Sequence, residues 1–182
     1  LAMVDSSVGG KTAVDLPSGK NLAGAFHQPK AVFCDTGFLR TLPEEWRIDG
    51  MGEVLKYSVL GDAELFAALE RSPLAPVDEV AIARCIGMKR DVVEADEKES
   101  GVRKLLNLGH TFAHAIETLA QREDRDISHG EAVAMGLVLA SRLSDRVFRG
   151  DMDTPTELEG GLAIDLCDCG LYPQCPYDIE DM

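Results

Sequence analysis

The chain has 182 residues, of which 45% are hydrophobic, so it is long enough to bury one hydrophobic core and carry a smaller appendage. Its 32 acidic side chains outnumber 18 lysines and arginines, and the formal net charge of -14 argues against nucleic acid or an anionic membrane as the main partner. No apolar run reaches the length of a membrane span, and five cysteines without a repeating spacing are typical of a reducing compartment, so we expect a cytoplasmic protein.

The chain opens on a stretch, VDSSVGGKTAV at residues 4–14, that ends like a phosphate-binding loop. Asp5 stands where the first glycine of that motif belongs, and a carboxylate there would repel phosphate. Pro17 follows too soon for the long helix that a nucleotide loop needs. Two interpretations remain, a polar turn or a loop that binds a ligand rich in hydroxyl and phosphate groups. The residues offered to such a ligand would be Asp5, Lys11, Lys20 and Asn21.

The next elements change from strand to helix. A short apolar run, KAVFCD at residues 30–35, predicts a buried strand. A capping box of Thr41 and Glu44 then predicts a helix to about Leu60. Three further helices are predicted: a short one capped by Asp62 and ending at Leu69, one from Val77 into the acidic run 94–99, and one over Leu105–Ala120.

A second capping box, Ser128 and Glu131, opens a helix to about Phe148. This helix is apolar nearly all round, so we expect it at the centre of the core. Beyond Gly150 we expect a loose tail with one short helix around residues 156–169. The tail holds a cluster of cysteines that fits ordinary reduced thiols better than a zinc site, namely Cys167, Cys169 and Cys175.

Three of the four histidines fall within twenty residues, in or beside the two most apolar helices. His110 and His114 are four residues apart and share a helix face, as metal-ligand pairs do. His129 follows the Ser128 cap, where the positive end of the helix favours the neutral imidazole that a metal requires. A single helical histidine is more often an ordinary surface or core residue, whereas this grouping favours a metal site.

Glu53 and Lys56, in the stretch GMGEVLKY, stand three residues apart on one face of an otherwise apolar helix. A surface salt bridge is the ordinary explanation of such a pair. The flanking Met51, Val54 and Leu55 indicate a buried helix, however, where charged side chains are rare. A glutamate with two histidines is also the ligand set of a catalytic zinc site that keeps one position open for substrate.

Cations and amides elsewhere could form a binding pocket for a polyhydroxylated anion within this acidic protein. Part of this pocket comes from the stretch SGVRKLLNLGH, which precedes the histidine-bearing helix. Its members would be Lys11, Lys20, Asn21, Lys56, Lys89, Arg103, Lys104 and Asn107.

Five motifs in this order, VDSSVGGKTAV, GKN, GEVLKY, RKLLNLGHTFAHAIE and HGEAVAMG, closely resemble the 3-dehydroquinate synthase family. The resemblance implies a mainly α chain with the multihelical C-terminal domain of the dehydroquinate synthase-like fold at residues 39–182. Residues 1–38 would form an opening loop with short β-like segments. Because no Gly-rich dinucleotide fingerprint is present, these residues would be the remnant of an NAD-binding domain that is otherwise absent.

The family cyclises 3-deoxy-D-arabino-heptulosonate 7-phosphate to 3-dehydroquinate with release of phosphate, in the shikimate pathway, and uses NAD with Zn²⁺ or Co²⁺. The resemblance implies Glu53, His110 and His129 as metal ligands, and it implies a homodimeric full-length enzyme. It assigns a substrate hydroxyl to Asp5, the phosphate to Lys11, Asn21 and His114, the carboxylate to Lys89 and Arg103, and further ring groups to Lys56 and Asn107. It also implies that Lys20 binds substrate and that Asp5, Lys11 and Lys20 contribute to NAD binding.

Two other functions stay open. A metal-dependent NAD polyol dehydrogenase of the glycerol dehydrogenase kind would share the two-domain plan, although Lys89, Arg103 and the opening loop argue against it. The other is a non-catalytic helical module that binds a metal without turnover, because hydride transfer needs a nicotinamide held over the metal site.

Overall fold

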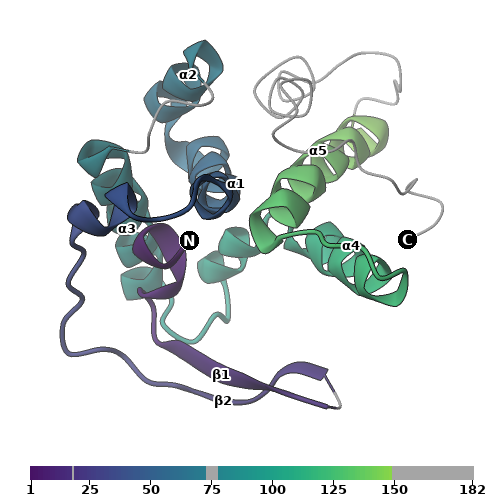
Figure 1. Ribbon diagram of the computed structural model, residues 1–182, viewed down its shortest axis with the longest axis horizontal. Helices are drawn as coiled ribbons and strands as arrows, with labels where there is room; N and C mark the ends of the chain where they lie inside the picture. The colour runs from purple at the N-terminus through teal and green to yellow at the C-terminus, as the bar shows by residue number, and fades with distance from the viewer. Residues whose placement is uncertain (18, 73–77, 149–182) are drawn as a thin grey trace.

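Figure 1 shows the computed structural model, which describes residues 1–17, 19–72 and 78–148. The described chain is mainly helical, with one β-hairpin near the N-terminus, so the predicted fold class is confirmed. The predicted tail helix and the three clustered cysteines lie outside the described residues, as do residues 73–77, which include the predicted helix start at Val77.

The N-terminal part begins with η1 (Ala2–Ser6), a single π-helical turn, and continues into a hairpin of β1 (Lys11–Leu16) and β2 (Gly19–Phe26). The two strands are antiparallel, with Lys11 opposite Phe26, and they extend away from the helices (Figure 1). The chain therefore continues from the opening loop as a strand, whereas a nucleotide loop would lead into a helix.

The predicted buried strand at residues 30–35 is wrong, because this segment is irregular and exposed, and Phe33 is 93% exposed. A strand needs a neighbour for its backbone hydrogen bonds. Within the described residues the sheet consists of β1 and β2, which pair with each other. The segment leads instead into η2 (Thr36–Arg40), a 3₁₀ helix capped by the Asp35 carboxylate.

The first long helix, α1 (Glu44–Gly61), confirms the prediction, but its capping box is wrong. Thr41 ends the 3₁₀ helix before it, and its hydroxyl donates to the carbonyl oxygen of Phe38 at 3.2 Å. Pro43 is the N-terminal flanking residue of α1 and offers no side-chain cap, so the backbone at the proline sets the start of this helix.

The next two predicted helices are present, and the first of them has the cap that the sequence predicts. The Asp62 carboxylate accepts from the backbone N–H of Leu65 and begins α2 (Ala63–Arg71). Asp78 caps α3 (Glu79–Ala95) in the same way through the N–H of Ala81.

The helix predicted over 105–120 is two elements. A 3₁₀ helix, η3 (Val102–Asn107), ends before Gly109, and α4 (His110–Arg122) begins after it. Gly109 has a φ of 77°, and a side chain there would meet the backbone of α5 at Leu137 N, at 2.9 Å. Leu105, the predicted first residue of this helix, lies in η3 instead and is 59% exposed.

The last helix, α5 (His129–Phe148), confirms both its predicted bounds and its place in the core. The capping box is complete, since Ser128 N donates to the Glu131 carboxylate at 2.7 Å and Glu131 N donates to the Ser128 hydroxyl at 3.4 Å. The helix packs against α4 and α1 and buries every side chain from residue 132 to 137. Of the helices described, none combines the length and apolar character needed to cross a bilayer.

Candidate metal and substrate site

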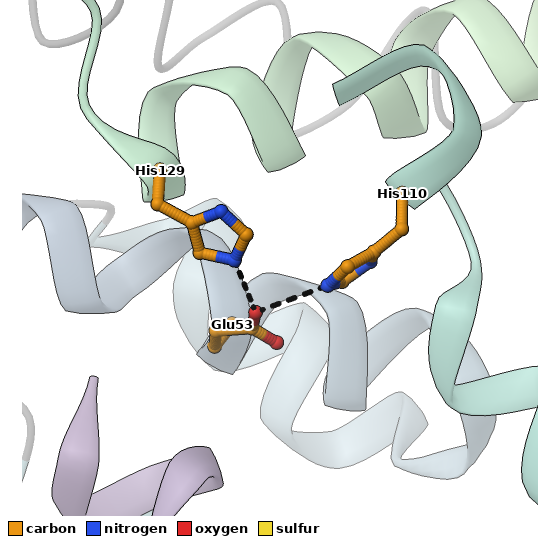
Figure 2. A group of neighbouring side chains, drawn as sticks. All are labelled: Glu53, His110 and His129. Carbon is orange, nitrogen blue, oxygen red and sulfur yellow. Dashed lines mark ion pairs between the residues drawn. The ribbon is translucent and has the colours of Figure 1, made fainter. Parts of the chain in front are cut away.

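Three side chains from three different helices converge on one point, as Figure 2 shows. Glu53 lies in the buried middle of α1, while His110 and His129 are the first residues of α4 and α5. The Glu53 Oε1 atom lies 3.5 Å from His110 Nε2 and 3.3 Å from His129 Nε2. All three candidate ligand atoms lie within 4.8 Å of one another, which is close enough to share one ion.

The close approach of α1 and α5 depends on glycine at the crossing. A side chain at Gly52 would collide with the backbone of Gly130, and one at Gly130 would collide with the backbone of Asp49. The Asp49 carboxylate also accepts from Gly130 N at 2.6 Å, which ties the start of α5 to α1. This crossing places His129 over Glu53.

The other ring nitrogen of each histidine is held by an acceptor. His110 Nδ1 lies 3.2 Å from the Leu108 carbonyl oxygen, and His129 Nδ1 lies 3.0 Å from Glu117 Oε1. An Nδ1–H that donates to an oxygen leaves the Nε2 lone pair free for a metal. Two imidazole nitrogens and one carboxylate, oriented in this way, fit a zinc or cobalt ion with an open coordination position.

The charges in the cluster are strongly coupled. Burial raises the pKa of Glu53, but hydrogen bonds with His110 and His129 and the charge of Lys56 outweigh it, so the pKa is well below normal. The hydrogen bond to Glu117, with that to Glu53, raises the pKa of His129 to about 9. A metal bound at His129 Nε2 would therefore displace a proton at neutral pH.

A second cluster surrounds Asp5 and joins the first through Lys56. The Lys56 ammonium lies 2.5 Å from Glu53 Oε2 and 3.4 Å from Asp5 Oδ1. Lys89 Nζ lies 3.1 Å from the same Asp5 oxygen and donates to the Asp5 carbonyl oxygen at 2.7 Å. The Tyr57 hydroxyl also donates to Asp5 Oδ1.

The environment of this second cluster keeps Asp5 ionised. Burial raises the pKa of the Asp5 carboxyl, yet the two ammonium groups and the tyrosine hydroxyl together hold it below its usual value. Burial lowers the pKa of Lys89, and Asp5 opposes that effect. The structure thus brings together three of the predicted substrate residues, Asp5, Lys56 and Lys89, beside the three-ligand cluster.

Arg103 is buried and serves first as a structural link. Its guanidinium donates to the carbonyl oxygens of Gly9 at 2.6 Å and Glu97 at 2.5 Å. It also lies 5.6 Å from the centre of the Phe26 ring, which ties η3 to the hairpin. Among the described residues, the buried Nε of Arg103 has no hydrogen-bond partner.

The remaining predicted residues are spread around these clusters. Both Lys11 and Asn107 contact the Glu99 carboxylate: Lys11 Nζ lies 2.5 Å from Oε2, and Asn107 Nδ2 donates to Oε1 at 2.7 Å. His114 is exposed and lies outside the three-ligand cluster, with its ring centre 5.8 Å from that of His110. Lys20 and Asn21 lie on β2, and the exposed Lys104 lies in η3.

The sequence reasoning missed Tyr57, Glu99 and Glu117. Each of them pairs with a residue that the sequence had singled out. Glu117 follows His114 by three residues on one helix, a spacing that could have drawn attention to it. The contacts of Tyr57 and Glu99 join distant segments, and no local pattern predicts them.

Comparison with known proteins gives the context for this arrangement. Residues 50–159 match the family 3-dehydroquinate synthase C-terminal, and residues 1–48 match 3-dehydroquinate synthase N-terminal. The 3-dehydroquinate synthase of Opitutus terrae is 55% identical over 81% of this chain and 42% of that protein. The enzyme of the same name from Xanthomonas campestris is 49% identical over 90% of this chain and 50% of that protein. The chain spans about half the length of the curated relatives it matches.

Solved structures of related cyclases share the fold. A 2-epi-5-epi-valiolone synthase from Streptomyces hygroscopicus, with NAD⁺ and Zn²⁺ bound, is 30% identical and matches with a TM-score of 0.75 over 92% of this chain and 46% of that one. A 2-deoxy-scyllo-inosose synthase, complexed with carbaglucose-6-phosphate, NAD⁺ and Co²⁺, is 34% identical, with a TM-score of 0.67 over 81% of this chain and 42% of that one. Given the extent of the family match, this chain belongs to the 3-dehydroquinate synthase family.

Proposed function

We propose that this chain is the metal- and substrate-binding part of a 3-dehydroquinate synthase. The enzyme would convert 3-deoxy-D-arabino-heptulosonate 7-phosphate to 3-dehydroquinate with release of phosphate, a lyase reaction of the shikimate pathway that leads to aromatic amino acids. The observation that carries the proposal is the convergence of Glu53, His110 and His129 beside the Asp5 cluster in a chain of this family. Residues 39–182 would form the helical domain. Residues 1–38 would be the remnant of the NAD-binding domain that this chain carries.

We assign the three converging side chains to Zn²⁺ or Co²⁺, with NAD as the second cofactor. The donor set fits such an ion, and the related cyclases were solved with NAD⁺ and one of these metals. When bound, the metal supplies a Lewis acid that lowers the pKa of a substrate hydroxyl. Asp5 and Lys20 with Lys11 would contribute to the NAD side of the site.

The chain's own residues would bind and orient the substrate. The ionised Asp5, held by Tyr57, would accept a hydrogen bond from a substrate hydroxyl. Lys56 and Lys89 would offer ammonium groups to the polar ring substituents and the carboxylate. Arg103 would also bind the substrate carboxylate, Asn107 would bind ring groups, and Lys20 would make a supporting contact. The substrate phosphate would be bound by Lys11, Asn21 and His114.

The proposal includes a cytoplasmic location and a homodimeric full-length enzyme. The location is supported by the free thiols of Cys34 and Cys85, which fit a reducing compartment. The dimer is implied by the family resemblance.

The test is calorimetric titration of the zinc-loaded 182-residue chain with the heptulosonate phosphate, followed by a phosphate-release assay with NAD. We expect the substrate to bind and Lys89→Met to weaken it by about tenfold or more, because a charged hydrogen bond is lost. Lys98→Met, at an exposed lysine of the 96–101 loop, is the matched control and should leave the affinity unchanged.

Other outcomes separate the alternatives. Formation of NADH from glycerol, with no binding of the heptulosonate phosphate, would favour the polyol dehydrogenase. Tight substrate binding without phosphate release would show that the chain holds the site but needs the remainder of its longer relatives for turnover. Equal affinity of Lys89→Met and wild type would contradict the assigned substrate contacts.

A further inference from the structure

Glu117 lies between two histidines, His129 of the proposed metal site and the exposed His114. Its Oε1 lies 3.0 Å from Nδ1 of His129, and its Oε2 lies 3.0 Å from Nδ1 of His114. The carboxylate is largely buried, with 12% of its side chain exposed, whereas His114 is more than half exposed. The two imidazole rings are stacked with centres 6.3 Å apart and an interplanar angle of 29°. One carboxylate therefore holds a proposed metal ligand and an exposed neighbour at the same time.

The chemistry of a carboxylate fixes which ring nitrogens carry hydrogen. An ionised carboxylate only accepts hydrogen bonds, so both Nδ1 atoms must donate to it. In a neutral imidazole with Nδ1–H, the Nε2 atom is the acceptor. For His129 this nitrogen faces Glu53, to which it donates a hydrogen bond until a metal displaces its proton. For His114 it is a nitrogen that can accept a hydrogen bond or a proton from a ligand.

We propose that Glu117 is a positioning residue that sets His114 and His129 in the same Nδ1–H tautomer and so couples the metal ligand to the exposed histidine. The inference deepens the proposed function and rests on it for the role of His129 as a ligand. Such an outer carboxylate normally contributes about 10–100-fold to metal affinity. Here the same group also prepares His114 as an acceptor next to the metal.

Replacement by glutamine gives a specific prediction because an amide has one acceptor end and one donor end. With a metal on His129 Nε2, the Nδ1 of that ring must keep its hydrogen, so the amide oxygen of Glu117→Gln should face His129. The amide NH₂ then faces His114, whose Nδ1 must become an acceptor. His114 should therefore change to the Nε2–H tautomer while His129 does not.

The experiment uses the full 182-residue chain with ¹⁵N-labelled histidine, with and without Zn²⁺. Two-bond ¹⁵N–¹H correlation spectra report the tautomer of each ring, and calorimetry with Zn²⁺ alone reports the affinity. In zinc-loaded Glu117→Gln we expect the tautomer change at His114 and an affinity about 10–100-fold lower. The control is Glu123→Gln, which removes the same charge at the end of α4, where Glu123 pairs with Arg125, and should change neither.

Glu117→Ala keeps the inference testable apart from the metal. In the zinc-free chain it should remove the preference for Nδ1–H at His114. If His114 keeps the wild-type tautomer in both Glu117 variants, the inference is overturned, even when zinc still binds. If wild type binds no zinc but the alanine variant loses the Nδ1–H preference at His114, the positioning role at His114 stands and the proposed metal centre fails.

Discussion

Replacing Lys56 with methionine should destabilise the chain strongly and in a way that zinc partly reverses. Lys56 is 1% exposed, and its ammonium lies between two carboxylates, Glu53 at 2.5 Å and Asp5 at 3.4 Å. At an effective dielectric constant of about 20, Coulomb's law gives about 7 and 5 kcal/mol for these two attractions before desolvation is counted. Because the ammonium pays a large desolvation cost, the net loss on removing one buried partner is about 3–5 kcal/mol.

The assay is urea unfolding of wild type and Lys56→Met, followed by circular dichroism, with and without saturating Zn²⁺. Zinc should narrow the gap in unfolding free energy, since a cation bound to Glu53 replaces part of the missing charge. Lys98→Met removes an exposed charge and should stay within about 0.5 kcal/mol of wild type. A Lys56→Met variant as stable as the control would refute the account of the buried charges.

Three further predictions concern the frame around the site. Gly52→Ala should lower the unfolding free energy by about 1–3 kcal/mol and weaken zinc binding, because the added methyl group collides with the backbone of α5. Gly87→Ala, where the methyl group meets open space, should stabilise the chain slightly. Thermal unfolding distinguishes the two variants. Backbone hydrogen bonds from the 100–103 turn lower the pKa of Asp96 to about 2. The stability advantage of wild type over Asp96→Ala should therefore be complete above pH 4 and disappear as the pH falls towards 2. Urea titrations at a series of pH values measure this difference. Burial raises the pKa of the Cys85 thiol to about 12, so this thiol should react slowly with iodoacetamide at pH 8. Peptide mapping should show rapid labelling of the exposed Cys34 and little labelling of Cys85. Equal labelling would contradict the buried placement of Cys85.

The helix starts that the sequence predicts correctly with their caps are those determined by neighbouring residues. Asp62 and the Ser128–Glu131 box carry their own caps, and the structure uses both of them. The break at Gly109 is different in kind. It interrupts an apolar periodicity at a residue with positive φ, where a side chain would also lie 2.9 Å from Leu137 N of α5. Local spacing does not reveal that contact. The strand predicted at 30–35 is wrong for a similar reason, because a strand needs a partner strand from another part of the chain and the local sequence does not show whether one is present.

The candidate site divides along the same line. Spacing alone grouped three histidines and left open which two would join Glu53, and the family resemblance was needed to separate His114 from the ligand set. The structure places His110 and His129 at the first positions of two helices whose starts face α1, which explains why residues nineteen apart converge. The contacts of Glu117 with both His114 and His129 depend on the packing of α4 against α5, so the His129 contact is visible only in three dimensions.

The most direct test of the metal centre is the zinc content and zinc affinity of the purified 182-residue chain, by elemental analysis and calorimetry. Three variants serve as comparisons: Glu53→Ala, His110→Asn, which keeps the buried Glu53–Lys56 pair, and Glu94→Ala as an exposed control on α3. We expect about one Zn²⁺ per chain in wild type and the control, and loss of zinc in the two ligand variants. Zinc retained in both ligand variants, or absent from wild type, would contradict the three-helix metal centre.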